Sequence, residues 1–195
     1  ANYNFQSLGE YKTLLEQCNV TVEELKGVRN GQAYQGLLYS ATDDKGNKVG
    51  VPIKASKIGK SVGYEALQKK FEKSKMNIDK NKTREYLSPI IKNALSKSYN
   101  LDDLRKLLLA NNINPILRIN EQGRLYGVSF IDYHNKTIMN GSRLGKEFSA
   151  NALGELFANK SIIEKPQNIN SSQYERVDSD NSIDFSLGLS LFEQH

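Results

Sequence analysis

Two short stretches of this sequence combine the residue types that bind an anion. Ser56-Lys-Ile-Gly-Lys60 recurs as Ser142-Arg-Leu-Gly-Lys146, so a hydroxyl, two cations and a glycine occupy matching positions. A glycine lets the backbone approach a ligand and adopt positive φ, and exposed N–H groups at the start of a helix favour an anion. Serine hydroxyls and basic side chains contact phosphate oxygens. We therefore predict a phosphate-binding surface made of Ser56, Lys57, Gly59, Lys60, Ser142, Arg143, Gly145 and Lys146.

Two other interpretations compete for these stretches. A nucleotide-binding P-loop would use Gly59-Lys60-Ser61, but its pattern needs an earlier glycine where this chain has Lys54, and the second copy has Glu147 in place of the serine. Alternatively, Gly59 and Gly145 serve only a tight turn. That role leaves the matched basic residues unexplained, so phosphate binding is the preferred interpretation.

Few residues suit catalysis or metal binding. One cysteine, Cys18, and two histidines, His134 and His195, exclude an internal disulfide and a Cys/His zinc site. Cys18 follows an apolar helix face and is expected to be buried, whereas His134 lies in a polar turn and is expected to be solvated. The acid pair Asp43-Asp44 has no further ligands nearby in the sequence. We predict no catalytic residue, metal or cofactor, and keep a small phosphodiester-cleaving enzyme that uses Tyr64 or His134 as a third hypothesis.

The charge of the chain is unevenly placed. The 195 residues carry a net charge of +5. Residues 160–195 hold three basic and six acidic residues and carry −3, so residues 1–159 carry +8. The segment 54–84 alone has ten basic and three acidic residues. A basic body favours a polyanion, most often nucleic acid, although a solvated lysine-rich helix face is an alternative.

The composition also limits the class of protein. Apolar residues make up 38% and charged residues 25%, which excludes a coiled-coil rod and a wholly disordered chain. No stretch resembles a membrane span or an export signal, so we expect a cytoplasmic protein without membrane contact. Because the chain lacks an initiating Met, we expect it to be a fragment.

An internal duplication positions the two glycine-lysine stretches. Ser7 with Glu10 forms a capping-box pattern, and Asn100 precedes two acids, so each copy is predicted to begin with a short helix. A glycine turn and a strand hairpin follow in each copy, and a second helix is predicted to start near Tyr64 and near Ala150. The predicted strands are Tyr34–Ala41, Lys48–Lys54, Leu125–Ile131 and Thr137–Asn140.

These patterns predict an α+β fold with two duplicated helix–β-hairpin–helix units, each with a small antiparallel sheet, joined by a helix. The first unit is expected over residues 1–78 and the second over 100–159. Residues 79–99 form a basic linker and a helix that opens at Ser88-Pro89. Residues 160–195 form an acidic polar tail that we expect to be flexible. Its alternating stretch 183–192 is strand-like, and either packs as a C-terminal strand or adds to a sheet edge or a partner.

The chain also resembles a known family in these regions. The residues that carry the resemblance are Tyr126–Asp132 and Asn140–Ala150, with Tyr11–Val22, Gly36–Thr42 and Ser61–Gln68. They resemble the region after the nuclease domain in mobilisation relaxases of Bacteroides-type conjugative elements. The Gly-Ser-Arg-Leu-Gly-Lys stretch is the most distinctive part.

The resemblance covers roughly residues 5–158. It implies a module that binds transfer-origin DNA, while the nicking tyrosine and the metal-binding histidines of the family belong to a domain that this sequence does not match. We therefore expect a DNA-binding module without its own nicking residues. An interaction module that docks accessory or coupling proteins of the relaxosome is the alternative.

Overall fold

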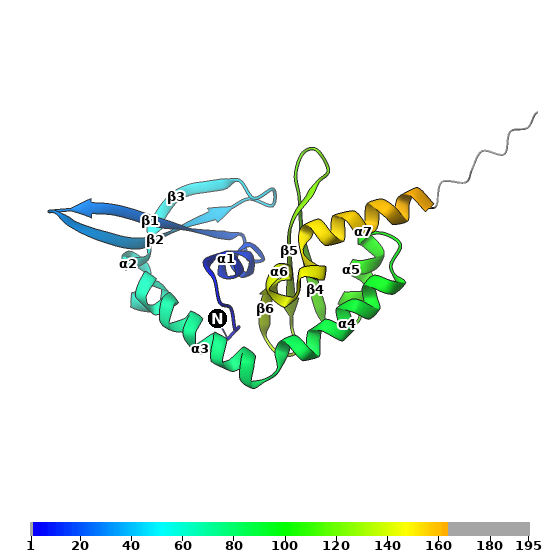
Figure 1. Ribbon diagram of the computed structural model, residues 1–195. Coiled ribbons are helices and arrows are strands. Elements are labelled where there is room, and N and C mark those ends of the chain that lie inside the picture. The colour runs from blue at the N-terminus through cyan, green and yellow to red at the C-terminus, as the bar shows by residue number, and fades with distance from the viewer. Residues whose placement is uncertain (1, 164–195) are drawn as a thin grey trace, which may run out of the picture. The chain divides into compact units, whose positions relative to one another are not determined.

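The chain runs twice through the same order of elements (Figure 1). The computed structural model describes residues 2–163. The first pass consists of α1 (Leu8–Glu16), β1 (Val20–Arg29), β2 (Gln32–Thr42), β3 (Lys48–Lys54), α2 (Ala55–Ile58), the 3₁₀ turn η1 (Lys60–Val62) and α3 (Tyr64–Lys80). After α4 (Thr83–Lys97), the second pass consists of α5 (Leu101–Leu109), β4 (Ile113–Ile119), β5 (Leu125–Asp132), β6 (Thr137–Asn140), α6 (Gly141–Leu144), η2 (Lys146–Phe148) and α7 (Ala150–Ile163).

Each pass builds one antiparallel three-stranded sheet, in the order β1-β2-β3 or β4-β5-β6. The predicted α+β class with small antiparallel sheets is confirmed. The starts of the second helices at Tyr64 and Ala150 are also confirmed. The strands β1 and β4 were not predicted, although the Asn30-Gly31 turn after the alternating run from Val20 is a strong hairpin signal.

The helix that joins the two passes starts earlier than predicted. It begins at Thr83, and Pro89 lies inside it rather than at its first position. An interior proline removes one helical hydrogen bond and costs about 3 kcal/mol. The helix tolerates this because Leu87, Ile91 and Leu95 are all buried against the second half of the chain.

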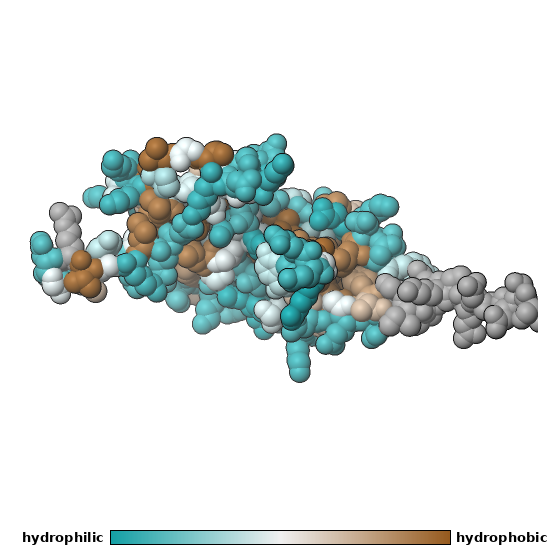
Figure 2. Space-filling model, turned by 90° about the horizontal axis from the view of Figure 1, so that it is seen from above, coloured by the Kyte–Doolittle hydropathy of each residue, from teal (hydrophilic) through white to brown (hydrophobic). Residues whose placement is uncertain are grey.

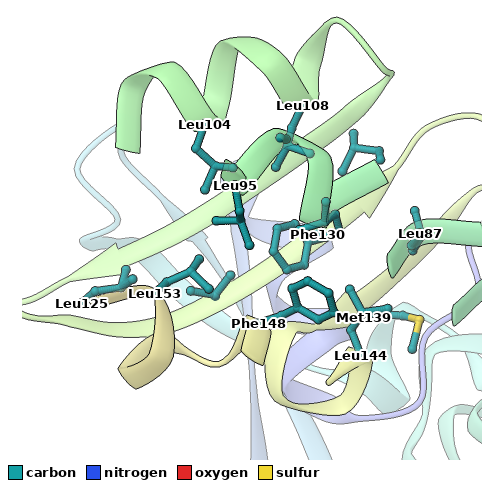
Figure 3. Close-up of a cluster of buried hydrophobic side chains, with 14 of the residues drawn as sticks. Leu87, Leu95, Leu104, Leu108, Leu125, Phe130, Met139, Leu144, Phe148 and Leu153 are labelled. Carbon is teal, nitrogen blue, oxygen red and sulfur yellow. The ribbon is translucent and has the colours of Figure 1, made fainter. Parts of the chain in front are cut away.

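Two hydrophobic clusters hold the fold together. The larger one joins α4, α5, α6, η2 and α7 to one face of the second sheet, with Phe130 and Phe148 completely buried at its centre (Figure 3). The smaller one contains Tyr39 of the first sheet together with Phe5, and it extends to Ile131 and Ile138 on the other face of the second sheet. The second sheet is therefore covered on both faces.

The N-terminal segment attaches the first half of the chain to the second. Asn4 pairs in parallel with Thr137 at the outer edge of β6. The buried carboxylate of Glu10 accepts hydrogen bonds from the backbone N–H of Gln6 at 2.7 Å and of Asn140 at 2.9 Å. Ser7 accepts from the N–H of Glu10, which confirms its half of the predicted capping box, whereas the first bond of Glu10 reaches the N–H of Gln6 instead of that of Ser7. The second bond crosses to the start of α6.

The end of α7 reaches beyond the predicted second unit. Lys160 belongs to α7, and its ammonium group donates hydrogen bonds to the carbonyl oxygens of Leu95 and Ser98. Residues 160–163 of the predicted tail thus belong to α7, and the tail from residue 164 on, including the strand-like stretch 183–192, lies outside the described residues. Among residues 2–163, no helix is long and apolar enough to cross a membrane.

We predict that Glu10→Ala lowers the free energy of unfolding by about 3 kcal/mol, because it leaves buried N–H groups of Gln6 and Asn140 without an acceptor. Urea denaturation monitored by circular dichroism measures the loss. Gln17→Ala, directly after the same helix, is the control and should cost less because Gln17 is exposed and its side-chain amide donates to the Thr13 carbonyl of that helix. A Glu10→Ala variant as stable as the parent would show that the carboxylate does not join the two halves.

Candidate nucleic-acid interface

The two glycine-lysine stretches adopt one conformation. Each is a four-residue helix, a glycine and a 3₁₀ turn that leads into a long helix. The residues before the short helices, Lys54 and Asn140, have φ/ψ of −64°/137° and −65°/141°. Gly59 and Gly145 are both close to fully extended, with φ/ψ of 158°/162° and 176°/155°. We name residues 55–63 loop 1 and residues 141–149 loop 2.

Loop 1 is fastened to the first sheet by a buried tyrosine. The hydroxyl of Tyr39 donates a hydrogen bond to the carbonyl oxygen of Val62 at 2.8 Å, and lies 3.3 Å from the hydroxyl of Tyr11. Burial, followed by the hydrogen bond with Tyr11, raises the pKa of Tyr39 well above its ordinary value. Tyr39 is therefore a core residue of the predicted strand Tyr34–Ala41.

The polar side chains of loop 1 are available to a ligand. Ser56, Lys57 and Lys60 are exposed, and no hydrogen bond or ion pair involves their side chains within residues 2–163. A Cβ atom added to Gly59 would meet nothing within 4 Å, so the backbone is open to close approach. The N-terminus of the 17-residue helix α3 follows directly and favours an anion.

Loop 2 is partly used for packing. Arg143 donates a hydrogen bond to the side-chain oxygen of Gln6, and its Nε lies 3.6 Å from the buried Glu10 carboxylate. A Cβ atom added to Gly145 would lie 2.6 Å from the Glu147 carboxylate and 3.1 Å from the Phe148 ring, so the backbone here is less open than at Gly59. The remaining predicted residues, Ser142 and Lys146, are exposed.

The sequence therefore identified two equivalent loops, whereas the structure distinguishes them. The half of the chain that carries loop 1 offers free cations, and loop 2 offers fewer because Arg143 pairs with Glu10 of α1. The sequence did not reveal the role of Glu10, because its place in the capping-box pattern gives no indication of a partner in the second half. A direct DNA contact by Arg143 remains a prediction.

The basic segment, residues 54–84, continues the charge of loop 1 along α3. Within residues 2–163, none of its ten Lys and Arg side chains takes part in an ion pair. Lys69 and Lys73 are exposed one turn apart, while the aliphatic part of Lys70 is half-buried and its Nζ lies 5.7 Å from the Phe5 ring centre. Burial, followed by the nearby Lys73 charge, lowers the pKa of Lys70.

The other residues singled out from the sequence do not assemble into a site. Cys18 is exposed, so the expectation of burial was wrong; it lies in the uncovered turn between α1 and β1. His134 is exposed, as expected, and Asp132 holds its turn by accepting from the N–H groups of His134 and Asn135. Tyr126 is 61% exposed. Within the described part of the chain, no group of three or more His, Cys, Asp or Glu residues could hold a metal ion.

The comparisons with known proteins identify no relative. No protein-family model matches the sequence, no curated protein matches it, and no solved structure matches the fold. The function must therefore be argued from the geometry and charge of the chain.

We predict that Tyr39→Phe destabilises the protein by about 1–2 kcal/mol and speeds amide hydrogen exchange in loop 1, because the carbonyl of Val62 loses its donor. Hydrogen-exchange mass spectrometry and urea denaturation measure the two effects. Tyr126→Phe is the matched control, since the hydroxyl of Tyr126 has no hydrogen-bond partner within residues 2–163. Unchanged exchange in loop 1 of the Tyr39→Phe variant would contradict the role of Tyr39 as its anchor.

Proposed function

We propose that this chain is a DNA-binding module of a mobilisation relaxase that recognises transfer-origin DNA and has no nicking residues of its own. The observation that carries the proposal is the basic segment, whose ten cationic side chains lack ion-pair partners within residues 2–163. Uncompensated positive charge on one segment is the electrostatic footprint of a nucleic-acid-binding protein. The resemblance of loop 2 and the other matched stretches to relaxase sequences indicates which DNA is bound.

Loop 1 makes the first contacts in this proposal. Lys57 and Lys60 neutralise phosphates, and the hydroxyl of Ser56 donates to a phosphate oxygen. The bond from Tyr39 to Val62 holds the loop in place before DNA arrives, which reduces the entropy lost on binding. The exposed lysines of α3, Lys69 and Lys73, extend the contacts along the backbone.

The basic segment differs from the rest of the described chain in how its cations are paired. Within residues 2–163, the cations that pair with a carboxylate are Lys26, Lys48, Lys92, Arg118 and Arg143. All five lie outside the basic segment. Cations paired in this way attract a distant polyanion less strongly, because the nearby carboxylate cancels much of their electrostatic field.

We predict that the double variant Lys57→Glu/Lys60→Glu weakens binding to duplex DNA at least tenfold at low salt, and reduces the slope of log affinity against log salt by about 2. Fluorescence anisotropy with a labelled origin duplex over a salt series measures both quantities.

The matched control is Lys97→Glu/Lys106→Glu, which changes the net charge equally at two exposed positions outside the basic segment. It should weaken binding much less. Equal losses for the two double variants would mean that only the net charge matters, and that loop 1 is not the binding site. An absence of binding by the parent protein at low salt would refute the proposed function.

A second candidate function, docking of accessory or coupling proteins of the relaxosome, is favoured by the edge strand β3. All seven of its residues are exposed, and Val49, Val51 and Ile53 are 46%, 86% and 49% exposed. Figure 2 shows hydrophobic residues exposed among hydrophilic ones over the half of the molecule that contains β1–β3. An uncovered apolar edge strand is a common site of strand addition by a partner.

The two functions can be separated without changing charge. We predict that Val51→Ser/Ile53→Thr leaves DNA affinity within about twofold of the parent, because neither side chain contributes to phosphate contacts. The same anisotropy titration measures it. A large loss of DNA affinity would mean that β3 belongs to the DNA interface and is not a separate docking edge.

A further inference from the structure

The hairpin of β1 and β2 extends beyond the hydrophobic core. Leu37, opposite Glu24, is the last residue of β2 toward the turn that belongs to a buried cluster. Five further pairs follow, from Leu25–Gly36 to Arg29–Gln32, and no residue of this part belongs to either cluster. Figure 1 shows this two-stranded ribbon projecting away from the helices. We name residues 25–36 the ribbon.

The ribbon has a defined shape although no core supports it. Its two-residue turn, Asn30-Gly31, has φ of 51° and 74°, the positive values of the turn that matches strand twist. The ring of Tyr34 covers Gly27 on the opposite strand, since a Cβ atom added to Gly27 would lie 2.6 Å from it. This pairing of an aromatic ring with a cross-strand glycine stabilises the exposed strands.

The exposed side chains of the ribbon suit base edges better than a protein surface. Lys26 and Gln35 are directly opposite each other, and Val28 and Ala33 follow on the same face toward the turn. The Lys26 ammonium lies 3.3 Å from the Glu24 carboxylate, but the Lys26 side chain is 66% exposed and stays open to a ligand. Glutamine pairs with adenine, lysine with guanine, and small apolar side chains contact the thymine methyl group. Val28 is 72% exposed and meets no apolar neighbour in the core.

The dimensions of the ribbon agree with those of the major groove of DNA. The four steps from Leu25 to Arg29 span about 14 Å at the usual rise of a strand. The major groove of DNA is about 12 Å wide and 8.5 Å deep, and admits a two-stranded ribbon. The ribbon is therefore long enough to reach the floor of the groove while the sheet remains outside.

The Lys26–Gln35 face of the ribbon and loop 1 also lie on the same side of the first sheet. Gln35 and Tyr39 are four residues apart on β2, so their side chains lie on the same face. Loop 1 is attached to that face through the bond from Tyr39 to Val62. A duplex that contacts Lys57 and Lys60 with its phosphates would thus meet the Lys26–Gln35 face of the ribbon.

We infer that the ribbon enters the major groove of duplex DNA and reads its sequence through Gln35 and Lys26. This inference rests on the proposed function and adds base recognition to it. The two activities are separable, because loop 1 supplies affinity for any duplex and the ribbon supplies the preference for one sequence.

The test uses a pool of duplex DNA with a randomised central segment. The parent protein should enrich a preferred duplex, which it binds at least about a thousandfold more tightly than a scrambled duplex. A shortened variant lacks Lys26–Arg29 and Gln32–Gln35, so that Asn30-Gly31 connects Leu25 directly to Gly36 and both base-reading residues are removed. It retains both hydrophobic clusters and is expected to fold, as thermal denaturation would confirm.

The shortened variant should bind the preferred and scrambled duplexes almost equally, with affinity for the scrambled duplex within about threefold of the parent. Gln35→Ala should reduce the preference at least about fivefold. Gln17→Ala, an exposed glutamine after α1, is the matched control and should leave it unchanged. Lys57→Glu/Lys60→Glu should weaken both complexes alike.

Three results would overturn the inference. If the preference survives in the shortened variant, the ribbon does not read bases, and the proposed function stands without it. The same conclusion follows if the parent protein binds duplex DNA but enriches no sequence. If the parent binds no duplex at low salt, the proposed function fails and the inference fails with it.

Discussion

The buried carboxylate of Glu10 is the interaction on which the arrangement of the two halves depends. One of its oxygens accepts from Gln6 and closes the start of α1, and the other accepts from Asn140 at the start of α6. A fully buried carboxylate is tolerated only when hydrogen bonds and a counter-charge replace water. Arg143 provides that counter-charge, and its use here determines that loop 2 offers fewer free cations than loop 1.

The two sheets differ because only one of them has both faces covered. The face of the second sheet that meets Phe5 carries Ile131 and Ile138, which pack into the smaller cluster. The corresponding face of the first sheet carries the ion pair between Glu23 and Lys48, which remains in contact with water. The second half of the chain is therefore more completely covered, and the first half leaves its ribbon, edge strand and loop exposed to solvent.

The difference between the two halves follows from which of their basic side chains are neutralised by a carboxylate. In the basic segment the helix α3 uses few residues for packing, chiefly Leu67 and Ile78, and leaves Lys69 and Lys73 in solvent. Solvated lysines keep their hydration cost low and retain their field toward a polyanion. A rigid loop anchored by Tyr39 beside such a helix combines fixed backbone geometry with flexible charges, which suits phosphates at varied positions.

The sequence alone determined the features that depend on neighbouring residues. The capping signals at Ser7 and Asn100, the repeat of the two loops and the returning strands follow from local hydrogen bonding and periodicity. Tertiary structure decided the rest, because burial is a property of contacts between distant segments. Cys18 is exposed as a result, and helix α4 continues past Pro89. Arg143 pairs with a carboxylate more than a hundred residues away, so that two similar sequence motifs have different surroundings.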